Sequence, residues 1–150
     1  MSKDAAYFKP PSLIERLFNK LFGVLVGLGL GLRHNYLLEV RGRKSGRLYS
    51  TPVNVVTRDG KRFLVAPRGD TQWVRNAQAI GEVSLKKGTR SEAFRLRALP
   101  DEEKAEILKA YLDQFKTTVQ RYFPVPSGSP VGEFRPLVAR YPVFELIAKQ

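Results

Sequence analysis

The chain has 150 residues, 43% of them apolar, which suits one domain with a buried core and disfavours disorder. It has no cysteine, which excludes disulfides, thiolate catalysis, iron–sulfur clusters and cysteine-ligated zinc; with His34 as its single histidine, we expect neither a metal site nor a serine–histidine hydrolase. The formal net charge of +12 favours an anionic partner, and composition leaves nucleic acid, anionic lipid headgroups and a multiply charged small ligand open.

The first 32 residues differ in character from the rest of the chain. Residues 1–11 are polar and end in two prolines, so we expect a loose tail there, and Ser12 suits the N-cap of a helix. Apolar residues then recur at helical spacing and run into an uninterrupted apolar and glycine stretch over residues 21–32, flanked by basic residues. That stretch is shorter than the ~20 residues that a membrane-spanning helix needs.

Three interpretations of residues 13–32 stay open at the level of sequence. A signal-peptide core of this length exists, but this one starts late and lacks small residues before a cleavage site. The segment also suits a helix lying on an anionic membrane surface, which predicts a cytoplasmic protein held peripherally on the inner face of the cell membrane. It equally suits a helix that packs on the domain's own core, as expected of a cytoplasmic protein.

Strand-like segments dominate the middle of the chain. Asn35–Arg41 alternates apolar and polar residues, and Ser50–Arg58 is rich in valine and threonine, with Pro52 early, where a strand tolerates the missing N–H. Asp59-Gly60 is a strong hairpin signal before a return strand over Arg62–Ala66. These strands follow one another with no helix between them, so they should pair antiparallel.

Helices and strands alternate in the second half of the chain. Asp70 or Thr71 is the expected cap of its first helix, and Gly81 the stop. Short strands joined by hairpins predict an α+β fold, in which a mostly antiparallel sheet of about six strands closes into a barrel with flanking helices. The elements expected are a helix over Thr71–Ile80, strands over Val83–Lys86 and Thr89–Leu99, a helix whose first turn holds Asp101, Glu102 and Glu103, a loop over Pro124–Pro136 and a last strand over Tyr141–Ile147.

The basic turn, which we define as Gly42-Arg43-Lys44-Ser45-Gly46-Arg47, connects the first two predicted strands. Its glycines permit positive φ angles, and successive backbone N–H groups in such a turn can form an anion-binding nest. The cationic side chains and the Ser45 hydroxyl add donors suited to carboxylate or phosphate. Taken alone, such a turn is more often a solvated hairpin tip, and its spacing does not match a Walker A loop.

A second candidate site follows the third strand, over Arg68–Asn76. A glycine turn there leads into a helix that carries the only tryptophan, Trp73. N–H groups at the start of this helix can receive an anion or a ring carbonyl, and Trp73 can lie against a flat ring. The alternative is a core position for Trp73 and a surface position for Asn76. Aromatic residues late in the chain are candidates for an apolar pocket with a tyrosine proton donor, although most should pack in the core.

The stretch Leu38–Ala79 resembles the deazaflavin-dependent nitroreductase family of flavin/deazaflavin oxidoreductases, whose fold is a split β-barrel. The order and spacing of the matching features agree together, which is far more specific than any one of them. The resemblance weakens after Leu99. Three features carry it: the basic turn followed by Thr51-Pro52, the hairpin Arg58-Asp59-Gly60 leading to Val65-Ala66, and Trp73 with Asn76 after a glycine turn.

The resemblance implies an oxidoreductase that binds reduced coenzyme F420, an 8-hydroxy-5-deazaflavin, and passes its hydride to a quinone, a nitro compound or an enone. The basic turn would hold the phosphate and acidic tail, and a tyrosine, Tyr111 or Tyr122, or solvent would supply the proton. FMN has one phosphate and no polyacidic tail, so it is disfavoured. The implied cofactor-binding residues are Arg43, Lys44, Ser45, Gly46, Arg47, Pro52, Val53, Ala66, Pro67, Arg68, Gly69, Trp73 and Asn76.

Two positions depart from the family pattern. Tyr49 stands where many relatives carry arginine, which removes one expected contact with the coenzyme tail. Asn54 replaces an aromatic residue that is common after the proline pair, which bears on substrate preference. Residues 1–32 are assigned to a tail and helix, and residues 33–150 to the deazaflavin-binding barrel.

The expected partners are a small hydrophobic substrate and, through residues 13–32, an anionic membrane surface. The chain is expected to be a monomer or a homodimer. Two other functions are kept in view. One is a non-catalytic protein that binds lipid, fatty acid or a membrane on the same barrel. The other is nucleic-acid binding, which the charge permits but which no basic motif interleaved with aromatic residues supports.

Overall fold

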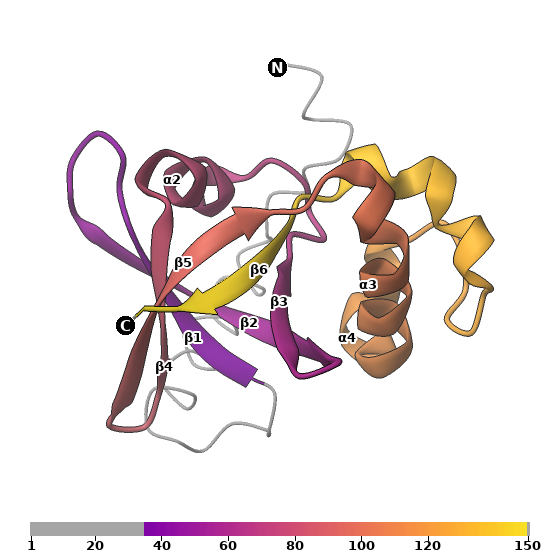
Figure 1. Cartoon of the computed structure of the whole chain (residues 1–150), viewed down its shortest axis with the longest axis horizontal. Coiled ribbons are helices and arrows are strands. Elements are labelled where there is room, and N and C mark those ends of the chain that lie inside the picture. Colours follow the sequence, from indigo (N-terminus) through magenta and orange to yellow (C-terminus); the bar gives the residue numbers. More distant parts are fainter. Residues whose placement is uncertain (1–34, 150) are drawn as a thin grey trace.

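The structure, a computed structural model, describes residues 35–149, so the helix expected over 13–32 lies outside the described residues. The described strands form a closed antiparallel barrel in the order β1-β2-β3-β6-β5-β4, with β4 pairing back onto β1. This confirms the predicted α+β barrel with flanking helices (Figure 1). The strands are β1 (Asn35–Arg41), β2 (Leu48–Arg58), β3 (Lys61–Val65), β4 (Glu82–Lys87), β5 (Arg90–Ala98) and β6 (Val143–Ala148).

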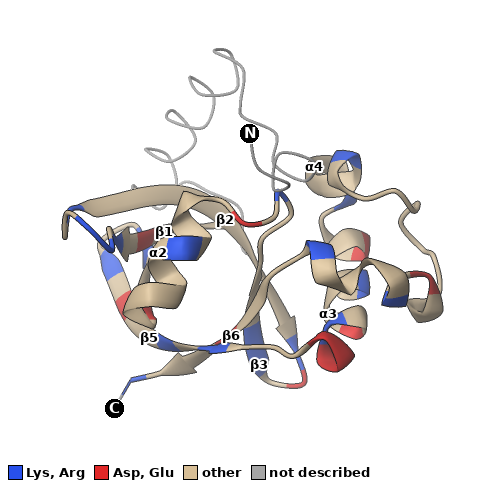
Figure 2. Ribbon diagram, turned by 90° about the horizontal axis from the view of Figure 1, so that it is seen from above, with Lys and Arg blue, Asp and Glu red and all other residues tan. Residues whose placement is uncertain are grey.

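The helices lie on separate sides of the barrel. Figure 2 shows α2 beside β1 and β5, whereas α3 and α4 lie beyond β3 and β6. The loop predicted over Pro124–Pro136 instead contains one 3-10 helix after Pro130 and the start of a second, in which Pro136 supplies the fixed φ that suits a first helical turn. The helical elements are α2 (Gln72–Ile80), α3 (Asp101–Gln114), α4 (Lys116–Val119) and the 3-10 helices η2 (Gln120–Tyr122), η3 (Val131–Glu133) and η4 (Arg135–Arg140).

Local signals placed most of the element ends. Gly81 ends α2 in the left-handed conformation, with φ 80° and its N–H donating to Ala77 O at 2.7 Å, as predicted. β2 begins at Leu48 rather than Ser50, because Leu48 still pairs with Arg41 across the hairpin. β6 begins at Val143 rather than Tyr141, because the Tyr141 N–H donates to Val138 O at the end of η4 and Pro142 has no N–H to donate.

The strand β2 is a wall shared by two hydrophobic clusters. Successive strand residues point to opposite faces of a sheet. Val55 therefore points into the barrel cluster with Leu38 and Phe94, whereas Val56 points outward into the helical cluster with Leu108 of α3. The late aromatic residues, which sequence placed either in a pocket or in the core, largely pack in the helical cluster. Its aromatic members include Tyr111, Phe115, Phe123, Phe134 and Tyr141.

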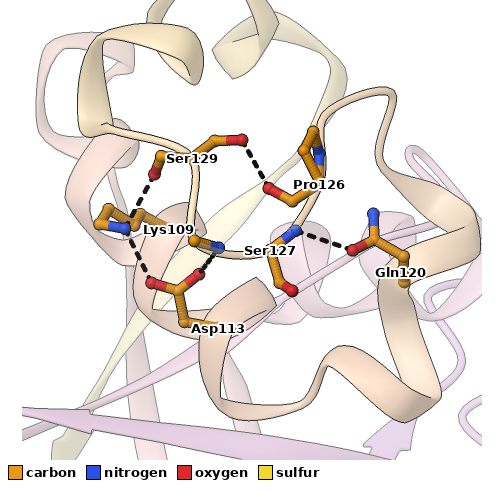
Figure 3. Close-up of polar contacts among 7 residues, drawn as sticks. Lys109, Asp113, Gln120, Pro126, Ser127 and Ser129 are labelled. Atoms are coloured by element: carbon orange, nitrogen blue, oxygen red, sulfur yellow. Dashed lines mark hydrogen bonds and ion pairs between the residues drawn. The ribbon is translucent and has the colours of Figure 1, made fainter.

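A polar network fastens the segment after η2 to α3 (Figure 3). Lys109 Nζ pairs with Asp113 Oδ2 at 2.8 Å and donates to Ser129 O at 2.8 Å. Asp113 Oδ1 accepts the Gly128 N–H at 2.7 Å, and Gln120 holds the same segment from its other side. Burial tends to raise the pKa of Asp113, but the hydrogen bonds from Lys109 and Gly128 outweigh burial and lower it below the ordinary value.

The lowered pKa of Asp113 predicts a pH-dependent contribution to stability. A carboxylate with a depressed folded-state pKa stabilises the fold above its unfolded pKa, about 3.9, and loses that effect as the pH falls through the folded value. We expect Asp113→Asn to lower the melting temperature at pH 7 by about 3 °C, equivalent to about 1 kcal/mol. The deficit should shrink below about pH 4.

Thermal unfolding of both proteins between pH 7 and pH 3 measures this effect. Glu133→Gln is the matched control, because it removes the same charge from an exposed side chain that makes no ion pair within residues 35–149. A deficit of constant size across the whole pH range would show that Asp113 contributes through its shape and not through its charge.

Candidate functional site

The basic turn is folded by its own hydrogen bonds. Gly42 N donates to Arg47 O at 2.7 Å, and Gly46 N donates to Gly42 O at 2.9 Å. Arg47 N donates to Ser45 Oγ at 3.1 Å, which leaves the Ser45 hydroxyl proton for an outside acceptor. The predicted anion-binding nest therefore has fewer backbone N–H groups to offer a ligand than expected. Among the described residues, the N–H groups of the turn without an acceptor are those of Lys44 and Ser45.

The basic turn is attached to α2 through Arg43. Its backbone N donates to Asn76 Oδ1 at 3.0 Å, and its Nη1 donates to the same oxygen at 2.7 Å. Nη1 also lies 3.1 Å from Gln72 Oε1. Asn76 is only 6% exposed. The alternative prediction, that Asn76 lies on the helix surface, is therefore wrong. The structure thus joins two predicted site residues that lie 33 positions apart.

The cations of the hairpin between β1 and β2 have no acidic partner in the described part of the chain. Within residues 35–149, no carboxylate lies within ion-pair distance of Arg41, Arg43, Lys44 or Arg47. Elsewhere many cations are paired, as in Arg97 with Glu103 at 2.8 Å. The blue connection between β1 and β2 stands out in Figure 2 without a red neighbour at its tip. An uncompensated, exposed basic loop of this kind is suited to bind a multiply charged anion.

A tight turn after β3 leads into α2. Gly69, with φ 83°, donates its N–H to Ala66 O at 3.1 Å, and Thr71 N donates to Gly69 O at 2.9 Å. Thr71 occupies the predicted cap position with extended backbone, but its side chain makes no capping bond. Its Oγ1 is buried without a hydrogen-bond partner, and the first turn of α2 contains no acidic residue. This helix start therefore keeps donors for a polar ligand group.

The other residues predicted to contact the coenzyme ring lie on α2, on β2 and in the turn after β3. Trp73 is half-buried and packs against the barrel cluster, with its ring 6.1 Å from that of Phe144. Pro52 and Val53 are half-buried on β2, where they pair with residues of β1. Ala66 is buried, and Pro67 and Arg68 follow it half-buried in the turn. Asn54, beside them on β2, accepts a hydrogen bond from Asn35 Nδ2.

The sequence analysis did not assign an individual role to either of two residues in this region, Gly42 and Gln72. A Cβ on Gly42 would lie 2.8 Å from both Ser45 Oγ and Tyr49 Cε2, so this glycine permits close packing and not a positive φ. Gln72 binds Arg43 from the helix turn that precedes Asn76. A signal for Gln72 was present, because residues four apart share one face of a helix.

Comparison with known proteins identifies the family of this chain. A family model described as F420H(2)-dependent quinone reductase matches residues 15–124. The chain belongs to this family. It is therefore an F420-dependent oxidoreductase, as the sequence resemblance implied. No curated protein matches the chain significantly.

Solved structures share the barrel of this F420H2-dependent reductase at low sequence identity. An F420-H2 dependent reductase is 22% identical, with a TM-score of 0.52, covering 76% of this chain and 94% of its own. A chain solved as a domain-swapped dimer is 22% identical, with a TM-score of 0.54 and coverages of 89% and 92%. A protein of unknown function from Agrobacterium tumefaciens is 17% identical, with a TM-score of 0.59 and coverages of 95% and 60%. At these identities the likeness establishes the fold.

The two tyrosines predicted as proton donors of the reductase lie on α3 and η2, and Figure 1 shows α3 on the other side of the barrel from the connection between β1 and β2. Tyr111 is 3% exposed and packs between the rings of Phe115 and Phe123, and burial raises the pKa of its hydroxyl. This position gives it no route to a substrate. Tyr122 is half-buried, and its hydroxyl oxygen accepts a hydrogen bond from Arg121 Nη2 at 2.7 Å, which leaves its own proton to donate.

The close packing around Gly42 predicts that Gly42→Ala destabilises the reductase. The added Cβ would displace the exposed side chains of Ser45 and Tyr49, and because these can move we expect a cost of about 1 kcal/mol, or about 3 °C in melting temperature. Gly132→Ala is the control, because its Cβ would meet nothing closer than Arg135 Nη1 at 3.6 Å. Thermal unfolding should also show partial recovery when Tyr49→Ala is added to Gly42→Ala. Equal melting temperatures for the two alanine variants would contradict this packing.

Proposed function

We propose that this reductase binds F420H2 along the edge of the barrel, with its acidic tail on the basic turn and its ring beside the start of α2. The uncompensated charge of the basic turn carries this proposal. A phosphate followed by carboxylates needs several cationic donors on one accessible loop, and this loop offers them without competition from carboxylates of the described residues. The family match makes F420 the coenzyme that this charge pattern fits.

The ring end of the proposed site rests on α2 and the turn before it. The unpartnered hydroxyl of Thr71 and the first N–H groups of α2 would donate to ring oxygens or to the phosphate. Trp73 would lie against the coenzyme ring, and Pro52 and Val53 would border the ring from β2. Trp73 is itself fixed by its packing against Phe144, so it offers a rigid surface.

When bound, the reduced coenzyme supplies a hydride from its deazaflavin ring. The protein's own groups would orient the ring, exclude water from its reactive face and position an acceptor against it. We propose a quinone-type acceptor, with nitro compounds and enones as other substrates of the same face. The Asn35–Asn54 amide pair would make the neighbouring wall polar where relatives carry an aromatic residue, which favours acceptors with carbonyl oxygens.

Two further features of the proposal concern assembly and location. A homodimer is proposed by analogy with the domain-swapped neighbour. Contact with an anionic membrane surface is proposed only through residues 13–32, outside the described part of the chain. Among residues 35–149, no helix has both the length and the apolar character needed to cross a membrane.

The charge of the basic turn predicts the effect of Lys44→Ala on coenzyme binding. Removing one charge-assisted contact should raise the Kd for F420 about ten-fold in ~0.15 M salt, and less at higher ionic strength. Titration of deazaflavin fluorescence measures this. Lys61→Ala is the matched control at the start of β3, beside the end of β2 that is remote from the basic turn, and should change the Kd less than about two-fold. Absence of F420 binding by the unaltered protein would refute the proposed function.

The positions of the two tyrosines predict different results for their removal. If Tyr122 supplies the proton, Tyr122→Phe should lower kcat about 100-fold with F420 binding unchanged. Tyr111→Phe should leave kcat within about two-fold, because its hydroxyl is buried in the helical cluster. Steady-state rates with a quinone acceptor measure both. A wild-type kcat in Tyr122→Phe would assign the proton to solvent.

A further inference from the structure

We infer that Asn76 and Gln72 are positioning residues, which act on the coenzyme through Arg43 and not by touching it. This inference rests on the proposed function, since it concerns how the same basic turn is held ready. The group formed by Arg43, Gln72 and Asn76 is called the latch. The sequence analysis named both Arg43 and Asn76 as cofactor-binding residues, and in the structure they are hydrogen-bonded to each other.

The latch centres on the side-chain amide oxygen of Asn76, Oδ1. That oxygen accepts both the backbone N–H and the Nη1–H of Arg43, at 3.0 Å and 2.7 Å. Gln72 Oε1 takes a further bond from Nη1 at 3.1 Å. Both helix residues present their oxygens to the same guanidinium, so α2 holds the backbone and the side chain of one turn residue together. A contact that fixes both parts restricts the turn far more than a side-chain bond alone.

Nothing else ties the tip of the basic turn to the rest of the described chain by hydrogen bonds. The other bonds of residues 42–47 stay within residues 41–47, including the bond from Arg41 Nη1 to Gly46 O. Lys44, Ser45 and Arg47 are exposed, whereas Arg43 is half-buried and Asn76 is buried. The latch is therefore the structural support, and its exposed neighbours are the groups left to meet an anion.

The latch also links the two ends of the proposed site. The same helix that holds Arg43 is preceded by Thr71, its N-cap residue, whose buried hydroxyl has no hydrogen-bond partner among the described residues. A ligand that reaches from the basic turn to the start of α2 needs both at a fixed separation. Fixing that separation before binding lowers the ordering cost of association. Breaking the latch should therefore weaken binding although no ligand contact is lost.

The first test needs no coenzyme. Hydrogen exchange of the Arg43 amide, followed by NMR in the free protein, should become about ten-fold faster in Asn76→Ala, because its acceptor is gone. Asn76→Asp keeps an oxygen acceptor and should keep the amide protected. An Arg43 amide that exchanges equally fast in the wild type and in Asn76→Ala would overturn the latch. Melting temperatures confirm that each variant is folded.

The second test is a double-mutant cycle on F420 affinity, read by deazaflavin fluorescence. Arg43→Ala and Asn76→Ala should be strongly non-additive, with the double variant binding about as well as the weaker single one, a coupling of about ten-fold. Lys61→Ala with Asn76→Ala is the control pair and should be additive within about two-fold, because Lys61 lies outside the basic turn, at the start of β3. If the fold-changes in Kd caused by Arg43→Ala and Asn76→Ala multiply in the double variant, the two residues contact the ligand separately and the inference is overturned.

The two tests separate failure of the inference from failure of the proposed function. If the wild type does not bind F420, the proposed function fails while the amide exchange still decides whether the latch holds the turn. If the wild type binds F420 and the cycle is additive, the function stands and the latch fails as a positioning device. Gln72→Ala provides a graded case, since it removes one bond and leaves both Asn76 bonds in place.

Discussion

The alternation of side chains along β2 organises the rest of the molecule. Because neighbouring residues point to opposite faces, one strand closes the barrel with Val55 and supports the helical cluster with Val56. β2 starts where the basic turn ends, so the same strand also sets the direction in which that turn projects. Closure of the barrel then leaves the turn at its rim, against α2 and away from α3 (Figure 1).

Charge is distributed unevenly around this frame. On the strands and on α3, cations lie against carboxylates: Arg97 meets Glu103 and Glu145, and Lys109 meets Asp113. Among the described residues the basic turn lacks such partners, and the repulsion between its cations is relieved by solvent, by salt or by an anionic ligand. This unevenness supports our proposal that the turn anchors a polyacidic coenzyme, and no cluster of catalytic acids or bases is needed when the coenzyme carries the hydride.

Sequence reasoning worked where structure depends on near neighbours in the chain. The span of β1, the Asp59-Gly60 hairpin, the acidic start of α3 and the Gly81 stop of α2 follow from side-chain periodicity, glycine at positive φ and the helix dipole. The family resemblance added the place of the basic turn and of Trp73 and Asn76 along the chain. The cofactor-binding residues named from sequence remain a prediction, and two of them, Arg43 and Asn76, are hydrogen-bonded to each other in the structure.

Those roles depend on contacts between distant segments. The amino-acid sequence by itself determined the strands, the barrel class, the basic turn and the family. Tertiary structure alone decided that Arg43 bonds Asn76 across 33 positions, that Asn35 bonds Asn54, that β6 inserts between β3 and β5, and that Tyr111 is sealed in the helical cluster. The physical reason is that periodicity reports which face of an element is apolar, whereas the partner of that face is chosen only when the barrel closes.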